Sequence, residues 1–280
     1  MRTVRVDEIR DTVARLCWEA CYYLPSDVVQ GLKRAQATEQ SPIGESILTQ
    51  LIDNAELAAT EAIPYCHDTG MTIVYVDLGQ DVHIVGGSFA DAIQEGVRRG
   101  YKEGYLRNSV VGDPLRRVNT GDNTPAVLHT EIVPGDRIRI TVLPKGGGSE
   151  NMSAMKVLLP GEGEEGVKRF VLETVESAGG KACPPLIVGV GIGGSFDKVS
   201  EIAKRAILRD IGVHHPEPHI AALEKQLLEL VNQTGIGPQG LGGVNTALWV
   251  AVETYACHIA SLPVAVNLQC HAARKRIAVL

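Results

Sequence analysis

Apolar residues recur at intervals of about 3.6 positions along much of the chain, the spacing of one face of an α-helix. In residues 7–24, Ile9, Val13, Leu16 and Ala20 fall on one side. Ser41-Pro42 offers a cap and a first turn for a second helix. The pattern predicts helices over residues 7–24, 42–55, 89–104, 162–178, 196–208 and 220–232.

Shorter apolar runs predict strands at residues 71–79, 82–87 and 186–190. Residues 126–144 alternate apolar and polar positions around Pro-Gly-Asp, which predicts a β-hairpin. Helices and strands do not alternate regularly, so we expect an α+β fold in one domain, residues 1–280. A helical N-terminal lobe is expected to pack on a mixed α/β core, with a lobe boundary near residue 65.

Residues 246–266 are apolar enough to resemble a membrane span, but Glu253, His258 and Pro263 interrupt them. We interpret this segment as protein interior and expect no membrane partner. The N-terminus lacks the apolar core of a signal peptide, so a cytoplasmic location is expected. A net charge of −6 without a basic run argues against nucleic-acid binding.

The chain has six cysteines, and its length and expected cytoplasmic location argue against a disulfide framework. Cys17 and Cys21 lie four apart on a predicted helix and are expected to be buried. Cys66, Cys183 and Cys270 each lie in a segment rich in glycine or proline. There is no C-x-x-C pair of the kind that structural zinc sites use. Separated loop cysteines suit an iron–sulfur cubane with one open iron, although three buried cysteines would give the same spacing.

Gly189, Gly191 and Gly194 match G-x-G-x-x-G between a predicted strand and a predicted helix. This is the context of a dinucleotide-binding turn. However, Asp210, at the distance of the expected acidic residue, ends a helix rather than a strand. A dinucleotide-dependent dehydrogenase therefore stays a minor alternative, and the glycines predict a backbone turn close to a ligand or anion.

The strings PYCHDTGM, GGGSENMS, IGPQGLGG and CHIASLPVAVNLQCHAAR together resemble the α portion of class I fumarate hydratases and L-tartrate dehydratases. The resemblance runs from about residue 7 onward. It implies a [4Fe–4S] cluster, bound by Cys66, Cys183 and Cys270 in loops between the lobe and the core. Cys257 lies in the same motif without being a ligand, which implies a place in the core or behind the cluster.

The resemblance also implies roles for other residues. Asp68 and His258 match catalytic positions, Asp68 as the acidic group that handles protons beside the cluster. Arg107 matches an arginine that binds a substrate carboxylate. The substrate-binding set that the resemblance implies is His67, Asp68, Arg107, Gly146 and Gly147. At His67 the family usually has glutamine, so the charge of this side chain would depend on pH.

The expected function is the reversible dehydration of (S)-malate to fumarate, a small dicarboxylate, by an α subunit. The family's remaining groups, including the general base, belong to a β portion, so we expect a β subunit and an α homodimer within an α2β2-type assembly. L-tartrate dehydratase α subunit, converting tartrate to oxaloacetate, is the alternative within the same class. A cluster-bearing sensor or scaffold without turnover is the alternative in another class.

Overall fold

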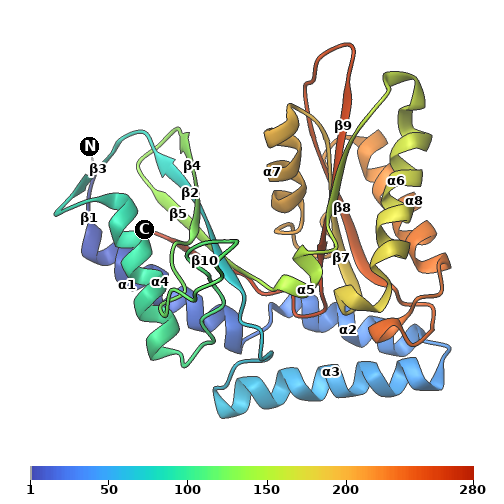
Figure 1. Ribbon diagram of the computed structural model, residues 1–280, viewed down its shortest axis with the longest axis horizontal. Helices are drawn as coiled ribbons and strands as arrows, with labels where there is room; N and C mark the ends of the chain where they lie inside the picture. Colours follow the sequence, from blue (N-terminus) through green and yellow to red (C-terminus); the bar gives the residue numbers. More distant parts are fainter. Residues whose placement is uncertain (1) are drawn as a thin grey trace. The chain divides into compact units, whose positions relative to one another are not determined.

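A computed structural model describes residues 2–280 (Figure 1). The chain divides into two compact units, and each contains segments that are distant in sequence. The first unit comprises residues 1–25, 55–147 and 274–280, and the second comprises residues 26–54 and 148–273. The division does not coincide with the lobe boundary expected near residue 65. The mixture of helices and mixed sheets confirms the α+β class.

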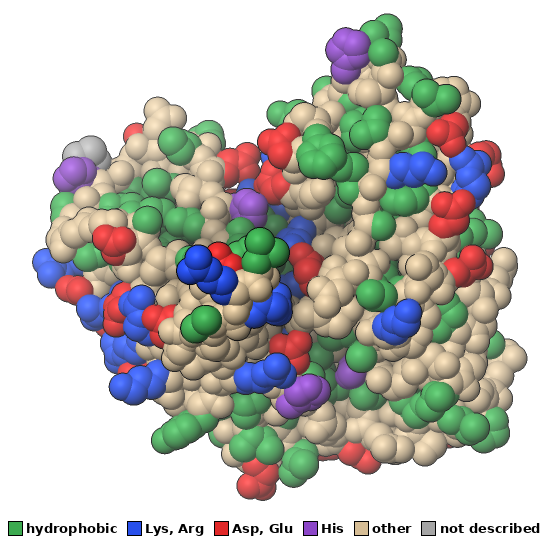
Figure 2. Space-filling model, viewed as in Figure 1, with side chains coloured by type: hydrophobic (Ala, Val, Ile, Leu, Met, Phe, Trp, Pro, Cys, Tyr) green, Lys and Arg blue, Asp and Glu red, His purple; other side chains and the backbone are tan. Residues whose placement is uncertain are grey.

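The first unit packs helices α1 (Val6–Tyr22) and α4 (Phe89–Glu103) against a four-stranded sheet. The two helices cross closely because α4 has glycine at the crossing. A Cβ at Gly96 would lie 2.7 Å from the Arg10 carbonyl, and one at Gly100 would lie 2.5 Å from the Ala14 carbonyl. Figure 2 shows basic and acidic side chains intermixed on the face in view. Arg99 of α4 forms ion pairs with Asp11 of α1 and with Glu103 of its own helix.

The sheet of the first unit has the order β10-β5-β2-β4, and it corrects the predicted hairpin. Its strands are β2 (Met71–Gly79), β4 (Val127–Val133), β5 (Ile138–Lys145) and β10 (Arg276–Val279). Strands β4 and β5 both form, but β2 lies between them, parallel to β4 and antiparallel to β5. The reason is burial: β2 is buried along most of its length and takes the central place, while half-exposed β4 takes the edge. A separate small sheet pairs β1 (Arg2–Arg5) with β3 (Val82–Val85) in parallel.

The second unit is built on a sheet of order β6-β9-β7-β8 with helices on both faces (Figure 1). Its strands are β6 (Ala154–Leu158), β7 (Leu186–Gly193), β8 (Ala247–Tyr255) and β9 (Leu262–Gln269). Helices α6 (Gly163–Ala178) and α8 (Pro218–Gln233) cover one face through the larger apolar core. Helix α7 (Phe196–Ala206) covers the other, where Val199 and Ala203 pack against Ala265. Helices α2 (Ser26–Thr38) and α3 (Pro42–Glu61) precede these elements in sequence.

Residues 246–266 form strands β8 and β9 rather than a continuous buried segment. The two strands are buried for most of their length. Residues 254–260, the end of β8 and most of the connection to β9, are exposed, so the prediction of an interior segment was only partly right. Over residues 2–280, none of the helices is long and apolar enough to cross a membrane.

The six helices predicted from periodicity are confirmed as α1, α3, α4, α6, α7 and α8, with ends that shift by a few residues. The predicted strand at 71–79 is confirmed with the same bounds, and the strand predicted at 186–190 extends to Gly193. Strands β1, β6, β8, β9 and β10 were not predicted. They are short, or they lie in the glycine-punctuated part of the chain where no clear alternation is present.

Candidate active site

The segment from Cys66 to Gly70 connects α3 to β2 in the first unit, and its end is fixed by hydrogen bonds from three directions. The Thr69 hydroxyl donates to the Arg107 carbonyl at 3.0 Å, and the buried Tyr101 hydroxyl lies 2.8 Å from the Thr69 carbonyl. The Asn123 amide donates to the Gly70 carbonyl at 3.2 Å. Gly70 has a φ of 78°, and a Cβ there would lie 2.6 Å from the backbone of Lys145. Only glycine therefore allows this loop to approach β5 so closely.

The Asp68 carboxylate accepts two backbone hydrogen bonds. The Gly70 amide donates to Oδ1 at 3.0 Å, and the Gly147 amide donates to Oδ2 at 2.9 Å. A Cβ at Gly146 would lie 3.3 Å from the same Oδ2. The structure thus brings together Asp68, Gly146 and Gly147, three of the residues chosen from sequence, in one unit. The glycines allow the backbone after β5 to pass directly beside the carboxylate.

Arg107 and His67 are exposed in the same unit. The Arg107 backbone is tied to the Cys66–Gly70 segment through the Thr69 hydroxyl, while its side chain extends from an exposed loop. Cys66 and Asp68 on either side of His67 are half-buried.

In the second unit, Cys183 and Cys270 lie at the same end of the sheet. Cys183 precedes β7 and Cys270 follows β9, and these strands are antiparallel neighbours with Ile187 opposite Gln269. The His271 amide donates to the Cys183 carbonyl at 3.2 Å, which joins the two cysteine loops directly. The Gln269 side-chain amide lies 3.7 Å from the Cys270 sulfur. Both cysteines are half-buried, in contrast to the fully buried Cys17 and Cys21.

The string IGPQGLGG supports the Cys183 loop. The backbone amide and the side-chain amide of Gln239 both donate to the Pro184 carbonyl, at 2.8 and 2.7 Å. Gly240 has a φ of 75°, and a Cβ there would lie 2.5 Å from the Cα of Gly180. Glu39 at the end of α2 fixes the far end of this segment by accepting from the Val244 amide at 3.0 Å. The sequence distinguished this string but did not indicate its role. In the structure it holds the Cys183 loop through hydrogen bonds to Pro184 and close backbone contact with Gly180.

The glycines of the dinucleotide-like pattern serve helix packing. A Cβ at Gly189 would lie 2.2 Å from the Ala203 carbonyl, and one at Gly191 would lie 2.4 Å from the Val199 carbonyl. Their absence of a side chain lets α7 lie directly on β7. Gly194, with a φ of 74°, forms the turn between these elements. The pattern therefore has a complete explanation in the contact between α7 and β7.

His258 lies apart from Cys183 and Cys270, in the exposed connection between β8 and β9. Its Nδ1 accepts from the Ala260 amide at 3.1 Å. The eight residues of β9 separate this connection from Cys270, a length of about 26 Å for an extended strand. Cys257, expected in the core or behind the cluster, is exposed instead, and that expectation was wrong.

Over residues 2–280, His, Cys, Asp and Glu side chains do not gather in groups of three or more that could hold a metal ion. The two cysteines of the second unit nevertheless suit thiolate ligation: their loops are hydrogen-bonded to each other and their sulfurs are half-buried. Cys66 is half-buried in the first unit. By contrast, burial raises the pKa of the Cys17 thiol well above its usual range and raises that of Cys21 to about 11. The raised pKa values make Cys17 and Cys21 poor thiolate ligands, whereas Cys66, Cys183 and Cys270 are half-buried.

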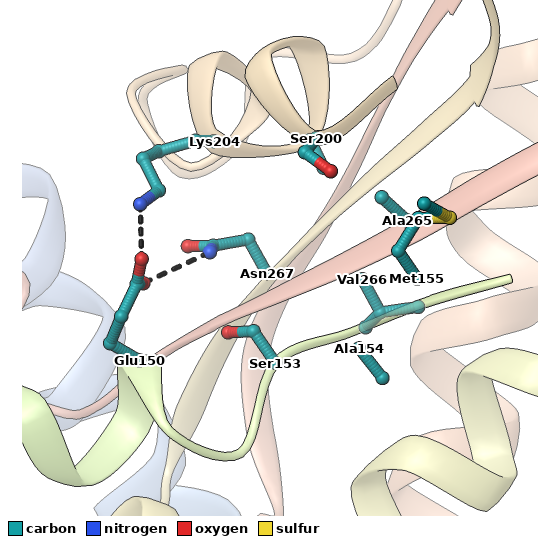
Figure 3. Close-up of a pocket in the computed structure, with 10 residues that line it drawn as sticks. Glu150, Ser153, Ala154, Met155, Ser200, Lys204, Ala265, Val266 and Asn267 are labelled. Atoms are coloured by element: carbon teal, nitrogen blue, oxygen red, sulfur yellow. Dashed lines mark hydrogen bonds and ion pairs between the residues drawn. The ribbon is translucent and has the colours of Figure 1, made fainter. Parts of the chain in front are cut away.

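A cavity of about 290 Å³ lies in the second unit, beside the segment that follows the glycines (Figure 3). The Glu150 carboxylate pairs with Lys204 of α7 and accepts from the Asn267 amide at 3.1 Å. The Ser153 hydroxyl accepts from the Leu268 amide at 3.0 Å. These bonds fix the end of β9 just before Cys270. Because Lys204 is neutralised by Glu150, the cavity carries no excess positive charge that would favour a dicarboxylate.

Known proteins resemble this chain over almost its full length. The family model described as fumarate hydratase (Fumerase) matches residues 10–279. A Methanocaldococcus jannaschii protein, provisionally named L(+)-tartrate dehydratase subunit alpha, is 45% identical over 276 residues, 96% of each chain. The L(+)-tartrate dehydratase subunit alpha of Escherichia coli K12 is 36% identical over 274 residues, covering 96% of this chain and 90% of that protein. The protein of the same name from Shigella boydii has the same identity and coverage.

Proposed function

Because the chain belongs to the fumarate hydratase family, we propose that it is the α subunit of a [4Fe–4S]-dependent hydro-lyase that interconverts (S)-malate and fumarate. The observation that carries the proposal is the setting of Asp68. Its carboxylate lies two residues after Cys66 and is fixed by the amides of Gly70 and Gly147. A fixed acidic group beside a cluster ligand is what proton transfer to a departing hydroxyl requires.

The cluster is proposed to be held by the thiolates of Cys66, Cys183 and Cys270. When bound, a cluster held by three protein ligands would supply a Lewis acid for the departure of the substrate hydroxyl. Asp68 then holds the proton that the departing hydroxide takes up. Arg107, exposed and tied by its backbone to Thr69, binds a substrate carboxylate with its two-pronged guanidinium. Gly146 and Gly147 leave room for the substrate beside Asp68, and His67 borders it from the exposed side.

The site is proposed to be completed by a β subunit. The relatives are named as alpha subunits, which supports a second chain of a different kind. Malate dehydration also needs a base for the C3 proton and further cations for the second carboxylate. We propose that the β subunit supplies them and that the assembly contains two α chains.

In this proposal, His258 acts at the active site of the second α chain and not at that of its own chain. It lies a strand's length from Cys270 of its own chain, so its own chain's Cys270 is out of reach. The surface around it is unusually apolar for an exposed loop: Ile259 is 92% exposed, Phe196 73% and Tyr255 57%. Exposed apolar patches of this kind mark interaction surfaces. We propose that this loop contacts the second α chain and brings His258 to that chain's site.

L-tartrate dehydratase is the second candidate, favoured by the names of the relatives described above. Malate and tartrate differ by one hydroxyl. A site that hydrogen-bonds that hydroxyl discriminates strongly against a substrate that lacks it, whereas a site without such a partner discriminates weakly. The kcat/KM ratio for the two substrates therefore separates the candidates.

The experiment is reconstitution of the full chain with its β subunit under anaerobic conditions, followed by assays with malate, fumarate and tartrate. We expect malate and fumarate to be the preferred substrates and the α chain alone to be nearly inactive. Asp68→Asn should lower kcat by about a hundred-fold or more with normal iron content, because it removes the proton-transfer group. Glu103→Asn, an exposed acidic residue of α4, is the control. Unchanged kcat in Asp68→Asn would reject Asp68 as the proton-transfer group. A strong preference for tartrate would identify tartrate, and not malate, as the substrate.

A further inference from the structure

Arg274, four residues after Cys270, is the largest fully buried side chain among those described, with 1% of its surface exposed. The roles proposed above do not use it. Burying a guanidinium is costly unless hydrogen bonds compensate for its lost hydration. Such a residue at this position therefore requires a structural or functional reason.

The reason lies in what the guanidinium contacts. Arg274 Nη1 donates to the backbone carbonyl of Asp68 at 2.6 Å. Its other terminal nitrogen borders Gly146, where a Cβ would lie 3.3 Å from Nη2 and 3.3 Å from Asp68 Oδ2. One planar group thus reaches both the backbone of Asp68 and the glycine segment that faces the Asp68 carboxylate. All of these residues belong to the first unit.

The buried thiol beside Arg274 does not compensate its charge. Burial raises the pKa of the Cys21 thiol to about 11, although the Arg274 guanidinium acts to lower it. Cys21 therefore stays neutral near pH 7, and its sulfur lies 4.0 Å from the Thr69 carbonyl. The guanidinium donates instead to the backbone carbonyl of Asp68.

We propose that Arg274 is a positioning residue, which holds Asp68 in place so that its carboxylate stays against the amides of Gly70 and Gly147. The inference rests on the proposed function for Asp68 as the proton-transfer group. In this arrangement the carbonyl of Asp68 is fixed by Arg274 and its two carboxylate oxygens are fixed by backbone amides. Removing the guanidinium frees the backbone of the segment, and the carboxylate then leaves the Gly147 amide.

The variants are Arg274→Lys and Arg274→Met. Lysine keeps the positive charge, but a single ammonium cannot reach Asp68 and the Gly146 side together as a planar fork does. Arg276→Lys and Arg276→Met are the matched controls. Arg276 is two residues further on and half-buried, and its side chain lies 5.9 Å from the ring of Tyr23 rather than at Asp68.

The first measurement is hydrogen exchange of the Gly70 and Gly147 amides by NMR in the full chain, which needs neither cluster nor turnover. We expect exchange at these two amides to accelerate about ten-fold or more in Arg274→Lys, with amides of β2 and α1 unchanged. A merely structural arginine would loosen β2 and α1 as well. If Arg274→Met does not fold, Arg274→Lys alone decides the result.

The second measurement is kcat and KM for malate in the assembled enzyme, with iron quantified. We expect Arg274→Lys to lower kcat by about ten-fold or more with little change in KM, because positioning of the acid matters most in the transition state. Unchanged exchange at Gly70 and Gly147 in an active enzyme would overturn the role of Arg274 and leave the proposed function standing. Exchange at both amides could also be faster in Arg274→Lys while the unaltered, reconstituted enzyme has no hydro-lyase activity. That result would support Arg274 as the residue that fixes Asp68 and would reject the proposed function.

Discussion

Asp68 is oriented by backbone groups, and this has consequences for the residues around it. The Gly70 and Gly147 amides both donate to its carboxylate, so these two hydrogen bonds depend on the position of the backbone and not on a side-chain donor. Arg107 differs, because only its backbone is tied to the Cys66–Gly70 segment while its side chain is exposed. Its proposed contribution to substrate binding can therefore be removed without disturbing Asp68.

Arg107→Lys separates a carboxylate-binding guanidinium from a solvated charge. Lysine keeps the charge but cannot form the two-pronged contact. Losing a buried charge-assisted pair costs about 2–5 kcal/mol, so kcat/KM for malate and fumarate should fall by roughly thirty-fold or more with normal iron content. Arg116→Lys, in the same exposed loop, is the control. The change in its kcat/KM should correspond to less than about 0.5 kcal/mol of transition-state free energy. Near-normal kcat/KM in Arg107→Lys would mean that Arg107 is a solvated surface charge without a role in substrate binding. It would also weaken the roles assigned to other residues by resemblance.

The cysteines give a second prediction at this scale. Replacing Cys66, Cys183 or Cys270 with serine should abolish the brown colour and iron of the anaerobically purified chain, about four irons in the unaltered protein. Cys257→Ser is the matched control, because Cys257 is exposed and yet lies at the far end of β9 from Cys270. Its iron content should stay normal. Loss of iron from Cys257→Ser to the same extent would show that the ligand set is wrong.

At single positions, the motifs identified residues that lie together but missed one that contacts them. Asp68, Gly146 and Gly147 were chosen from motifs, and they lie together. Arg274 lies in the motif CHAAR, yet nothing in its pattern distinguishes a buried guanidinium from a surface one. Its contact with Asp68 spans 206 positions of sequence, and only the folded chain reveals it.

At the scale of elements, local periodicity predicted the helices well because each buries one face against a neighbour. It failed for pairing between strands. The alternation in residues 126–144 is real, but it cannot reveal that β2, fifty residues earlier, is the more apolar strand and occupies the place between β4 and β5. Strand β9, with Pro263 near its start, was not predicted, although it lies beside β7 in the centre of its sheet. For β7, only the glycine-containing end, residues 191–193, was missed.

The contact between the IGPQGLGG segment and the Cys183 loop gives a prediction for this scale. In Gly240→Ala the new Cβ would meet the Gly180 Cα at 2.5 Å and would also carry the strain of a φ of 75°. We expect the free energy of unfolding to fall by about 2–4 kcal/mol, measured by urea denaturation. Gly212→Ala is the control: its φ of 98° carries the strain, but no atom lies within 4 Å of the new Cβ. That variant should lose only about 1 kcal/mol.

Because Gly180 and Gly240 belong to the support of Cys183, Gly240→Ala should also lower the iron content more than Gly212→Ala does. Equal losses of stability in the two variants would mean that backbone strain alone, and not the contact with Gly180, accounts for the glycine. The result would then remove the supporting role assigned to IGPQGLGG.

At the scale of the whole molecule, chain order and spatial grouping differ. The first unit takes segments from the start, the middle and the end of the chain, and the second takes the intervening ones. A boundary near residue 65 was expected because the first sixty residues have a helical pattern and mixed helices and strands follow. The predicted cluster ligands are correspondingly divided, with Cys66 in the first unit and Cys183 and Cys270 in the second. Sequence order alone therefore could not predict which unit each cysteine belongs to.

The last prediction concerns His258 and the second α chain. If each site takes Asp68 from one chain and His258 from the other, Asp68→Asn and His258→Asn should each inactivate a homodimeric α pair. A mixed pair, purified through a different tag on each chain and combined with the β subunit, contains one site with both defects and one with neither. It should regain about half of the wild-type kcat, as two-fold symmetry requires.

A pair of Asp68→Asn with Arg107→Lys is the control, since both residues belong to the same unit of one chain and neither site would be intact. An inactive mixed pair of the Asp68 and His258 variants would place both residues on one chain, against the length of β9. Full activity of His258→Asn alone would remove this histidine from the chemistry and leave the apolar loop around Ile259 as a contact surface only. Activity that returns in the mixed pair, and in neither homodimeric variant, would mean that His258 acts at the site of the other chain. This agrees with its separation from the Cys270 of its own chain by the length of β9, about 26 Å.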